Sequence, residues 1–441
     1  MISGGRQILL NQIGKKTALN MKLEVQVLCT EIVKPSSPTP PQLRHYQLSS
    51  LDQQIHPVYN HQVLFYPTNN VNILHLHRFK LSVSQALTHF YPLAGRIRNN
   101  SSVDCNDEGV PFREARVKGR LSDFLQNPVP EELNKLFAFP LDDAKELPMG
   151  IQFNTFDCGG IGIGLCISHK IGDALSYFTF LNTWAAIARG DRSKIVLPEF
   201  VSAELFPPRD IPVPPPGPAM EASEKNIATK RVVFSASKIE EIRAKYTENE
   251  FRPSRVEALS AFIWSRFIAS TKKKSSPESD RFYVIVHTVN LRTKFEPPLS
   301  AQSFGNIFRV AATIPSMDNE KDDGCINLVR QIRESIRKID KDYVRKLQAG
   351  EDEKSSPSKG ETIPFIFTSL CRFPLYEADF GWGKPVWVSS ASLNAKNLVA
   401  FMDTATGDGI EAWINLKEED MAEFESDEQL LAVCSTSKLL K

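Results

Sequence analysis

Apolar residues in the first half of the chain are spaced as in alternating strands and helices. The run Lys22–Leu28 predicts a first strand, and further strands are expected at Ser102–Asp104, Phe112–Val117, Gly150–Phe156 and Gly160–Ser168. An early helix is expected to bury Phe79, Val83, Ala86, Leu87 and Phe90. From Ile171 the apolar period lengthens from about two residues to about 3.6, which predicts a helix ending near Arg189.

A proline-rich stretch, residues 207–218 (PPRDIPVPPPGP), interrupts this pattern. Proline lacks a backbone N–H, so the stretch predicts an extended crossover between two halves. Beyond it, helices are expected at Ser237–Lys245, Ser254–Ser270 and Ile326–Leu347. Strands of this second half are expected at Thr229–Phe234, Phe282–Val289, Phe365–Leu370, Val386–Ser390, Leu398–Asp403 and Gly409–Ile414.

The whole pattern predicts an α/β protein with mixed sheets in both halves. We expect an N-terminal domain at residues 21–200, a proline-rich crossover at 201–228 and a C-terminal domain at 229–441. Residues 1–20 are expected to be an extension outside this fold, because Met21 directly precedes the first strand and is an alternative first residue.

Composition excludes several classes of function. The 441 residues carry 53 Lys and Arg against 52 Asp and Glu, so there is no net basic field to attract nucleic acid. Hydrophobic residues make up 41%, enough for a core, but no apolar run is long enough to cross a membrane. The seven cysteines are scattered without a C-x-x-C spacing, which indicates neither disulfides nor a zinc site. We therefore expect a soluble, cytoplasmic monomer without a bound metal.

The segment His169–Asp173 (HKIGD) lies where a predicted strand passes into a helix. A histidine at the end of a strand can point into a cleft, where its neutral Nε2 is free to act as a base. Asp173, in the first helical turn, is placed to interact with the helix dipole and with an arginine. The spacing H-x-x-x-D arises easily by chance, so a capping aspartate beside a packed histidine stays an alternative.

A second motif, Asp379–Gly383 (DFGWG), is less expected by chance. Its first three residues match the kinase D-F-G motif, but the other kinase motifs do not accompany it, so the kinase interpretation fails. Gly381 and Gly383 on either side of Trp382 predict a tight turn. A structural corner is the favoured interpretation, and a contact to substrate is the alternative.

Together these motifs resemble the plant BAHD family of acyl-CoA-dependent acyltransferases, from about Lys22 to the end of the chain. Further matching motifs follow in the order of the family: residues 91–96 (YPLAGR), 103–107 (VDCND), 290–292 (NLR), 304–306 (FGN) and 368–372 (TSLCR). Four segments look most like the vinorine synthase branch, which acetylates indole-alkaloid hydroxyls: residues 35–40 (PSSPTP), 51–53 (LDQ), 64–67 (LFYP) and 169–173 (HKIGD).

The resemblance implies a two-domain fold like chloramphenicol acetyltransferase, with a tunnel between the domains. Acyl-CoA, most simply acetyl-CoA, would enter from one side and an alkaloid alcohol from the other, and both would meet at His169. Nε2 would take the hydroxyl proton as the oxygen attacks the thioester, so neither an acyl-enzyme nor a permanently bound cofactor is expected. Cys166 is an odd number of residues before His169 on a strand, so it should face the other way.

The resemblance also assigns roles to other residues. Asp173 is expected to pair with Arg292 and to orient the site, and Asp379, Gly381, Trp382 and Gly383 are expected to be structural. Relatives usually have tryptophan where this chain has Leu370, and in some of them the indole N–H supports the oxyanion. Leucine cannot donate, so the Thr368 hydroxyl or a backbone amide is expected to serve.

Contacts to CoA are expected from three residues. Ser254 and Arg255 open a predicted helix, and helix N-termini hold phosphate groups. Asn306 of the FGN motif is the third. Two alternatives to alkaloid acetylation stay open: another donor (malonyl- or hydroxycinnamoyl-CoA) or an amine acceptor, and a catalytically silent binding protein, for which Leu370 is the support.

Overall fold

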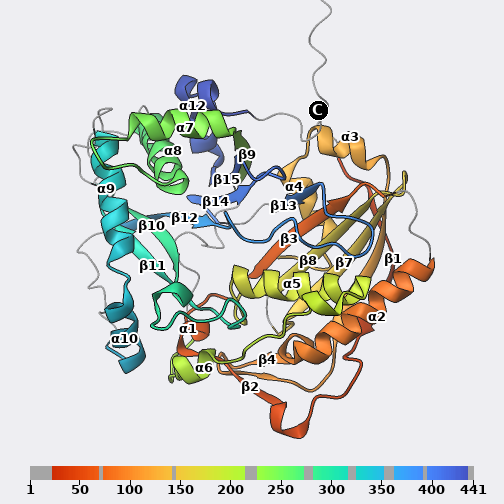
Figure 1. The fold of residues 1–441 in the computed structure, drawn as a ribbon. Helices are drawn as coiled ribbons and strands as arrows, with labels where there is room; N and C mark the ends of the chain where they lie inside the picture. The colour runs from red at the N-terminus through yellow and green to blue at the C-terminus, as the bar shows by residue number, and fades with distance from the viewer. Residues whose placement is uncertain are drawn as a thin grey trace, which may run out of the picture.

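The computed structural model describes residues 22–68, 73–141, 146–213, 226–272, 282–315, 324–351, 362–390 and 395–435. The expected extension at 1–20 and residues 214–225 of the crossover lie outside this range. The described chain forms two α/β halves with mixed sheets, as the sequence predicts (Figure 1). No helix within the described residues is both long enough and apolar enough to cross a membrane.

The first half is built on a six-stranded sheet with the order β1-β6-β7-β8-β3-β13. Its strands are β1 (Val25–Val33), β3 (Tyr59–Tyr66), β6 (Val110–Val117), β7 (Met149–Phe156), β8 (Ile161–Ser168) and β13 (Trp387–Ser389). Helices α2 (Ile73–His89) and α5 (Ala174–Arg189) pack side by side, and Trp184 Nε1 of α5 donates to Ser82 Oγ of α2 at 2.9 Å. The predicted face of the early helix is confirmed, since Phe79, Val83, Ala86, Leu87 and Phe90 are all buried.

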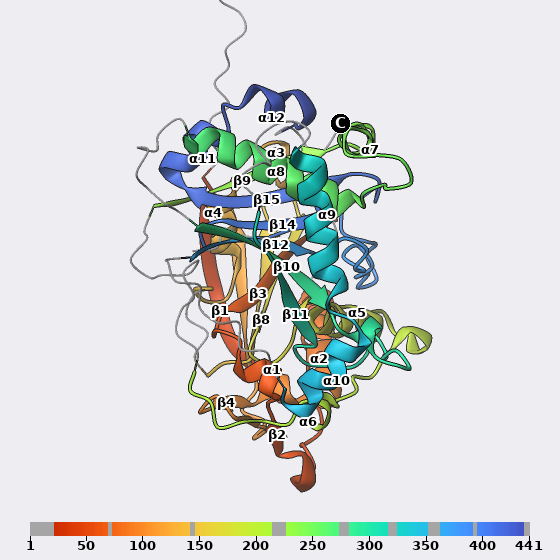
Figure 2. The same ribbon diagram turned by 90° about the vertical axis from the view of Figure 1, so that its left-hand side faces the viewer.

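The second half is built on another six-stranded sheet with the order β11-β10-β12-β14-β15-β9. Its strands are β9 (Ile227–Phe234), β10 (Phe282–Asn290), β11 (Phe308–Thr313), β12 (Thr362–Ser369), β14 (Leu398–Asp403) and β15 (Ile410–Lys417). The three central strands β10, β12 and β14 run parallel to one another. Helices α7 (Ala236–Lys245), α8 (Arg255–Lys272) and α9 (Gly324–Arg337) lie on the outer side of this sheet (Figures 1 and 2).

The remaining described elements are short. A three-stranded sheet pairs β2 (His45–Gln47), β5 (Ser102–Asp104) and β4 (Arg96–Arg98). The other α-helices are α1 (Ser50–Gln53), α3 (Leu121–Gln126), α4 (Pro130–Leu133), α6 (Ser202–Leu205), α10 (Lys341–Ala349), α11 (Glu418–Phe424) and α12 (Glu428–Val433). The single helix expected at Ile326–Leu347 is therefore wrong: α9 and α10 are separate. Asp340 separates them, because its carboxylate accepts the Tyr343 N–H as the N-cap of α10.

Strand β13 departs from the expected organisation. The strand expected at Val386–Ser390 was assigned to the second half, but β13 pairs antiparallel with β3 of the first sheet, with Trp387 opposite Phe65. The two rings stack with centroids 5.3 Å apart, and Trp387 is buried. Burying this large aromatic surface against Phe65 favours the pairing of β13 with the first sheet. A segment of the second half thus completes the sheet of the first.

The two faces of the second sheet differ in burial. Ile285, Phe365 and Phe367 face the outer helices and belong to the core of this half. The opposite face, called here the inner face, is covered where β15 and β9 meet β13, because Arg231, Glu411 and Trp413 are buried beside Trp387. On β10 and β12 the same face is half-buried, and on β11 Val310 and Ala312 are exposed. The inner face is therefore closed at one end and open at the other.

Candidate active site

His169 follows directly on β8 and is fixed through its backbone. Its N–H donates to the carbonyl of Val58 at 2.7 Å, and its own carbonyl accepts from Asn306 Nδ2 at 2.7 Å. The imidazole is half-buried, and its centroid lies 5.7 Å from the ring of Phe308 on β11. Phe308 stands on the inner face beside Asn290. The histidine of the HKIGD motif therefore lies where the open inner face of the second sheet meets the first half.

The surroundings of His169 keep its imidazole neutral. Burial lowers the pKa of His169 below its ordinary value, although Asp173 and Asn306 oppose the shift. A neutral imidazole has one nitrogen lone pair free to accept a proton. Near neutral pH this side chain can therefore act as a general base.

Asp173 is the N-cap of α5, and both of its oxygens are occupied. Oδ1 accepts the Ser176 N–H at 3.0 Å, while Arg292 Nη1 and Nη2 donate to Oδ2 and Oδ1 at 2.7 and 3.1 Å. The backbone N–H of Ile307 also donates to Oδ2, at 3.2 Å. Burial alone would raise the pKa of Asp173, but the charge of Arg292 and these bonds hold it below its ordinary value. Asp173 and Arg292 are thus brought together, and they join the HKIGD loop to the second half.

Asp173 binds the loop through hydrogen bonds and acts on the imidazole through its charge. Among the described residues, the hydrogen bonds to its carboxylate come from Arg292, Ser176 and Ile307, and none comes from the ring of His169. Its backbone N–H also donates to the carbonyl of Gly305 at 3.3 Å. This geometry is that of a positioning residue.

Asp52 is a part of the site that the sequence reasoning missed. Its side chain is fully buried in α1, and Oδ1 accepts from the backbone N–H and the Nδ2 of Asn306, both at 2.8 Å. Burial raises the pKa of Asp52 although these bonds and those of Ser49 oppose the shift. The capping box of Ser49 and Asp52 was a local signal for a short helix, but its burial depends on Asn306, far along the chain.

The same geometry shows what Asn306 contacts within the protein. Its side chain has no exposed surface, and its Nδ2 bridges Asp52 and the carbonyl of His169. In this structure Asn306 joins the histidine loop to α1. The expected contact of Asn306 with CoA stays a prediction.

Lys170 fixes the other side of the histidine loop. Its buried Nζ donates to the carbonyls of Asp52, Gln53 and Ile55 at 3.0, 3.1 and 2.7 Å. A cation that satisfies carbonyls at the end of a helix is favourable. Burial lowers the pKa of Lys170 to about 8, with Asp52 opposing the shift. The peptide units on both sides of His169 are therefore held by Val58 and by Asn306, and the next side chain is held by carbonyls of and just after α1.

Thr368 and Leu370 both lie at the inner face. Thr368 on β12 is half-buried, and its Oγ1 accepts from Thr288 Oγ1 of the neighbouring strand β10 at 3.3 Å. Leu370 packs against the core of the first half, and its backbone N–H donates to the carbonyl of Phe401 at 2.8 Å. The Leu370 amide is therefore already used, and the Thr368 hydroxyl as oxyanion donor stays a prediction.

The DFGWG segment forms a tight turn at the far end of α5. Asp379 Oδ1 accepts the N–H groups of Gly381 and Gly383 at 2.8 and 2.9 Å. Both glycines have φ near +100°, at +102° and +99°, a conformation that side chains disfavour. Arg189, the last residue of α5, donates to the carbonyl of Asp379 at 2.8 Å.

The distance along α5 separates this turn from the histidine loop. Asp173 caps one end of a helix of 16 residues, and Arg189 ends the other. At a rise of about 1.5 Å per residue the helix is about 24 Å long, too far for the turn to contact reacting atoms beside His169. The ring of Trp382 instead packs near Phe79 and Tyr66, with centroids 5.6 and 6.0 Å apart. This placement agrees with the expected structural corner.

Ser254 and Arg255 lie at the start of α8. Ser254 Oγ accepts the Glu257 N–H at 3.2 Å, and Arg255 Nη2 pairs with Asp403 Oδ1 at 2.9 Å. Asp403 ends β14, and Asn290 near His169 ends β10, so both sites lie at the same edge of the parallel strands. Two strand spacings separate β10 from β14, about 10 Å. Arg255 therefore lies at the C-terminal edge of the parallel strands, where it is held in an ion pair.

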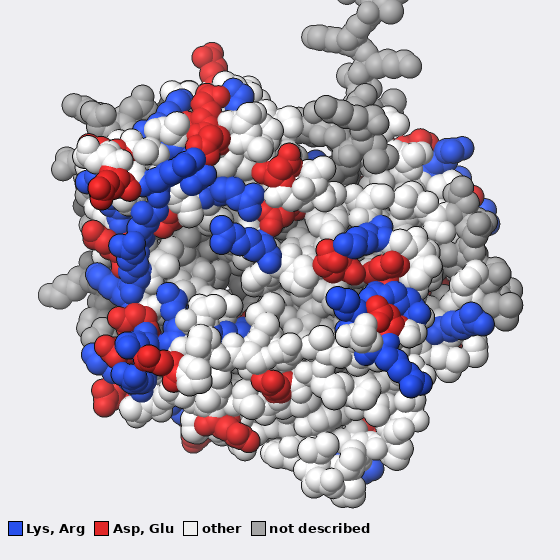
Figure 3. Space-filling view, viewed as in Figure 1, with Lys and Arg blue, Asp and Glu red and all other residues white. Residues whose placement is uncertain are grey.

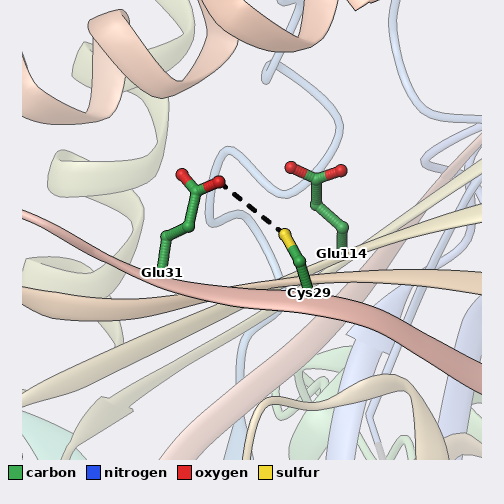
Figure 4. Close-up of side chains that lie close together, drawn as sticks. All are labelled: Cys29, Glu31 and Glu114. Atoms are coloured by element: carbon green, nitrogen blue, oxygen red, sulfur yellow. Dashed lines mark hydrogen bonds between the residues drawn. The ribbon is translucent and has the colours of Figure 1, made fainter.

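A group of potential metal ligands lies elsewhere, on the edge strand β1 and its neighbour β6. Figure 4 shows Cys29 Sγ and the carboxylates of Glu31 and Glu114 close together. The ammonium of Lys80 already pairs with Glu31 at 3.0 Å and with Glu114 at 2.5 Å. Lys80 already supplies these two carboxylates with the positive charge that a metal ion would bring. The group is therefore best described as a surface ion-pair cluster.

Comparison with known proteins gives consistent matches along the whole fold. The model of the Transferase family matches residues 23–431. Stemmadenine O-acetyltransferase of Catharanthus roseus is 40% identical over 423 residues, covering 92% of this chain and 97% of that protein. The crystal structure of vinorine synthase superposes with a TM-score of 0.80 at 36% identity, covering 95% of this chain and 100% of that chain.

More distant structures share the fold alone. The structure of F. sporotrichioides TRI101 complexed with coenzyme A and T-2 has a TM-score of 0.68 at 17% identity, covering 89% of this chain and 99% of that chain. The expected two-domain acyltransferase fold is confirmed by these matches.

Proposed function

The chain belongs to the Transferase (BAHD) family and is an acyltransferase, and on that premise we propose that it acetylates a hydroxyl group of a plant alkaloid with acetyl-CoA as donor. The observation that carries the proposal is the half-buried imidazole of His169 beside the inner face, where burial lowers its pKa. The relative from Catharanthus roseus is a stemmadenine O-acetyltransferase, which supports the acetyl donor and the alkaloid acceptor.

In the proposed reaction, both substrates meet at His169 without an acyl-enzyme. Nε2 of His169 takes the proton of the acceptor hydroxyl while its oxygen attacks the thioester carbonyl. The tetrahedral intermediate carries a negative oxygen, which the Thr368 hydroxyl is proposed to stabilise. The C–S bond then breaks, and the imidazolium gives its proton to the leaving thiolate. The ester and free CoA are the products.

Asp173 and Arg292 are proposed to position the loop, and Ser254 and Arg255 to contact CoA. On the face shown in Figure 3, basic side chains gather over the helices of the second half, and the surface is hollowed towards the centre. Such a basic margin suits the phosphates of CoA. The acceptor is proposed to reach His169 from the opposite side, through the tunnel that the family resemblance implies.

Leu370 offers a direct test of the oxyanion site. We expect Leu370→Trp to raise kcat by about tenfold, because an indole N–H could donate where leucine cannot, and the loss of one such donor costs about 100-fold or more. Leu370→Phe is the matched control, since it adds an aromatic ring without a donor. Steady-state thiol release measures both variants. Equal rates for Leu370→Trp, Leu370→Phe and the wild type would show that this position contributes no donor.

The acid limb of the pH profile tests the ionisation of His169. Only the neutral imidazole accepts a proton, so kcat/KM should fall as the pH drops through the pKa of the free enzyme. Burial lowers that pKa, so the limb is expected below the ordinary value of 6.5. The measurement is kcat/KM between about pH 5 and pH 8 at constant ionic strength. An acid limb above 6.5 would contradict the assignment.

A screen of donors against acceptors tests the function as a whole. Free thiol is followed with acetyl-, malonyl- and hydroxycinnamoyl-CoA, each with alkaloid alcohols and with spermidine. The proposal expects thiol release and an acetyl ester with acetyl-CoA and an alkaloid alcohol. Preference for another donor or for the amine would support the alternative acyltransferase, and no release with any pair would support a silent binding protein.

A further inference from the structure

Lys170 closes a ring of hydrogen bonds around the backbone of His169. Its Nζ donates to the carbonyl of Asp52 at 3.0 Å, and the carboxylate of Asp52 accepts from Asn306 Nδ2 at 2.8 Å. The same Nδ2 donates to the carbonyl of His169, whose peptide bond leads directly to Lys170. The ring joins three distant segments: α1, the histidine loop and the residues before β11. The place of His169 in the structure therefore depends on the Lys170 ammonium.

The donors of Lys170 match its acceptors one to one. A lysine ammonium carries three N–H donors and no acceptor. Its Nζ lies within hydrogen-bond distance of three carbonyl oxygens, those of Asp52, Gln53 and Ile55, and the bond to Ile55 is the shortest at 2.7 Å. Lys170 is 2% exposed, so bulk water does not reach these groups. The protonated amine thus satisfies the end of α1 with every donor it has.

Loss of the proton would break this match. A neutral amine keeps two N–H donors and gains a lone pair, which repels a carbonyl oxygen that faces it. At least one of the three buried carbonyls would then lack its donor, and a buried polar group without a partner is unfavourable. The contacts between α1 and the histidine loop would rearrange, and His169 is the next residue in that loop.

The surroundings of Lys170 bring this loss of a proton into an accessible pH range. Burial lowers the pKa of Lys170 to about 8, and the charge of Asp52 opposes the shift. Further charged or titratable side chains lie on the segments that bind the loop or its acceptors: His56, His169, Asp173, Arg209, Arg292 and Arg309. Asp173 and Arg292 are paired with each other, and the pKa of His169 lies below its ordinary value. The charge that acts on the ammonium is therefore that of Asp52.

We propose that Lys170 is a positioning residue for acyl transfer, and that loss of its proton at alkaline pH displaces His169 and slows the reaction. The inference rests on the proposed function, in which His169 is the base. It adds a second ionisation to the pH profile, on the alkaline side and from a group that touches neither substrate. A displacement of about 1 Å in a reacting group can cost about 100-fold in rate, so a small movement of the loop is sufficient.

The test measures kcat from about pH 6.5 to about pH 10 with saturating acetyl-CoA and stemmadenine. The kcat of the wild type should fall about tenfold between about pH 7.5 and about pH 9.5. Lys170→Met keeps the length of the side chain but has no donor at any pH. It should lower kcat by about 10- to 100-fold at neutral pH, leave the KM for acetyl-CoA unchanged and remove the alkaline fall.

Two further variants make the test specific. Lys118→Met is the matched control, because Lys118 pairs with Glu24 at the surface and its side chain is 71% exposed, so its profile should equal that of the wild type. Lys170→Arg stays charged throughout this range and should show no alkaline fall. Thermal unfolding checks that each variant is folded, and either variant of Lys170 is sufficient for the comparison of profiles.

Three results would overturn the inference: a flat alkaline profile of the wild type, an alkaline fall of equal size in a folded Lys170 variant, or a wild-type kcat of Lys170→Met at neutral pH. A purely structural role would lower the yield of Lys170→Met and leave the alkaline fall of the folded protein in place. A wild type that transfers acetyl to no alcohol or amine would instead overturn the proposed function, and the donor and acceptor screen decides this before any variant is made.

Discussion

His169→Ala is expected to lower kcat by about 100- to 10,000-fold, the usual contribution of a positioned general base. Without the imidazole, no group is placed to take the hydroxyl proton during attack on the thioester. The side chain is half-buried and its backbone bonds to Val58 and Asn306 do not involve the ring, so the protein should remain folded. Thiol release with saturating acetyl-CoA and acceptor measures the loss.

His45→Ala is the control for this experiment, because His45 is an exposed histidine on β2. Its activity should equal that of the wild type. A His169→Ala protein that keeps more than about a tenth of the wild-type kcat would rule out the imidazole as base. An acetylated protein detected by mass after acetyl-CoA alone would rule out direct transfer. Cys166 is a poor candidate for that adduct, because burial raises the pKa of its thiol.

Asp173→Ala should act mainly on stability. It leaves the guanidinium of Arg292 buried, with 2% of its side chain exposed and without its carboxylate, and breaking such a pair costs about 3–5 kcal/mol. We expect a large fall in the thermal unfolding temperature, less soluble protein and reduced activity. The preference among acyl donors should not change, because Asp173 orients the loop and touches neither substrate. Thermal unfolding and donor competition measure the two effects.

Two further variants make this second prediction specific. Asp191→Ala removes a carboxylate that pairs with Arg189 near the surface at the other end of α5, and it should alter stability little. Asp173→Ala combined with Arg292→Leu removes both charges and should recover part of the lost stability. The idea fails if the double variant is no more stable than Asp173→Ala, or if Asp173→Ala loses one donor selectively.

Local patterns were sufficient for much of the fold and for the central residue of the site. The change of period after β8 identified α5, and the strand-to-helix junction placed His169 and Asp173. The partner Arg292 came only with the family resemblance. Strand β11 was missed. Strand β13 was assigned to the wrong sheet, because a period of two residues shows that a strand exists and not which strand it joins.

The contacts of Asp52 and Lys170 that hold the loop around His169 could not be predicted either, and the reason is different. Asp52 and Lys170 are charged, and charged residues are usually exposed unless partners compensate for their burial. Those partners come from distant parts of the chain: Asn306 lies 254 residues from Asp52, and Lys170 reaches carbonyls more than 110 residues earlier. Such long-range pairing is a property of the fold and is invisible in local sequence.

Strand β13 also constrains how the protein is made. The first sheet needs Trp387–Ser389 to cover β3, so a ribosome must have synthesised nearly nine-tenths of the 441 residues before that sheet can be completed. Until then the edge of β3 stays unpaired, and unpaired strand edges invite association with other chains. The nascent N-terminal half should therefore depend on chaperones, and severing the two halves genetically should yield fragments that acquire their native form only together.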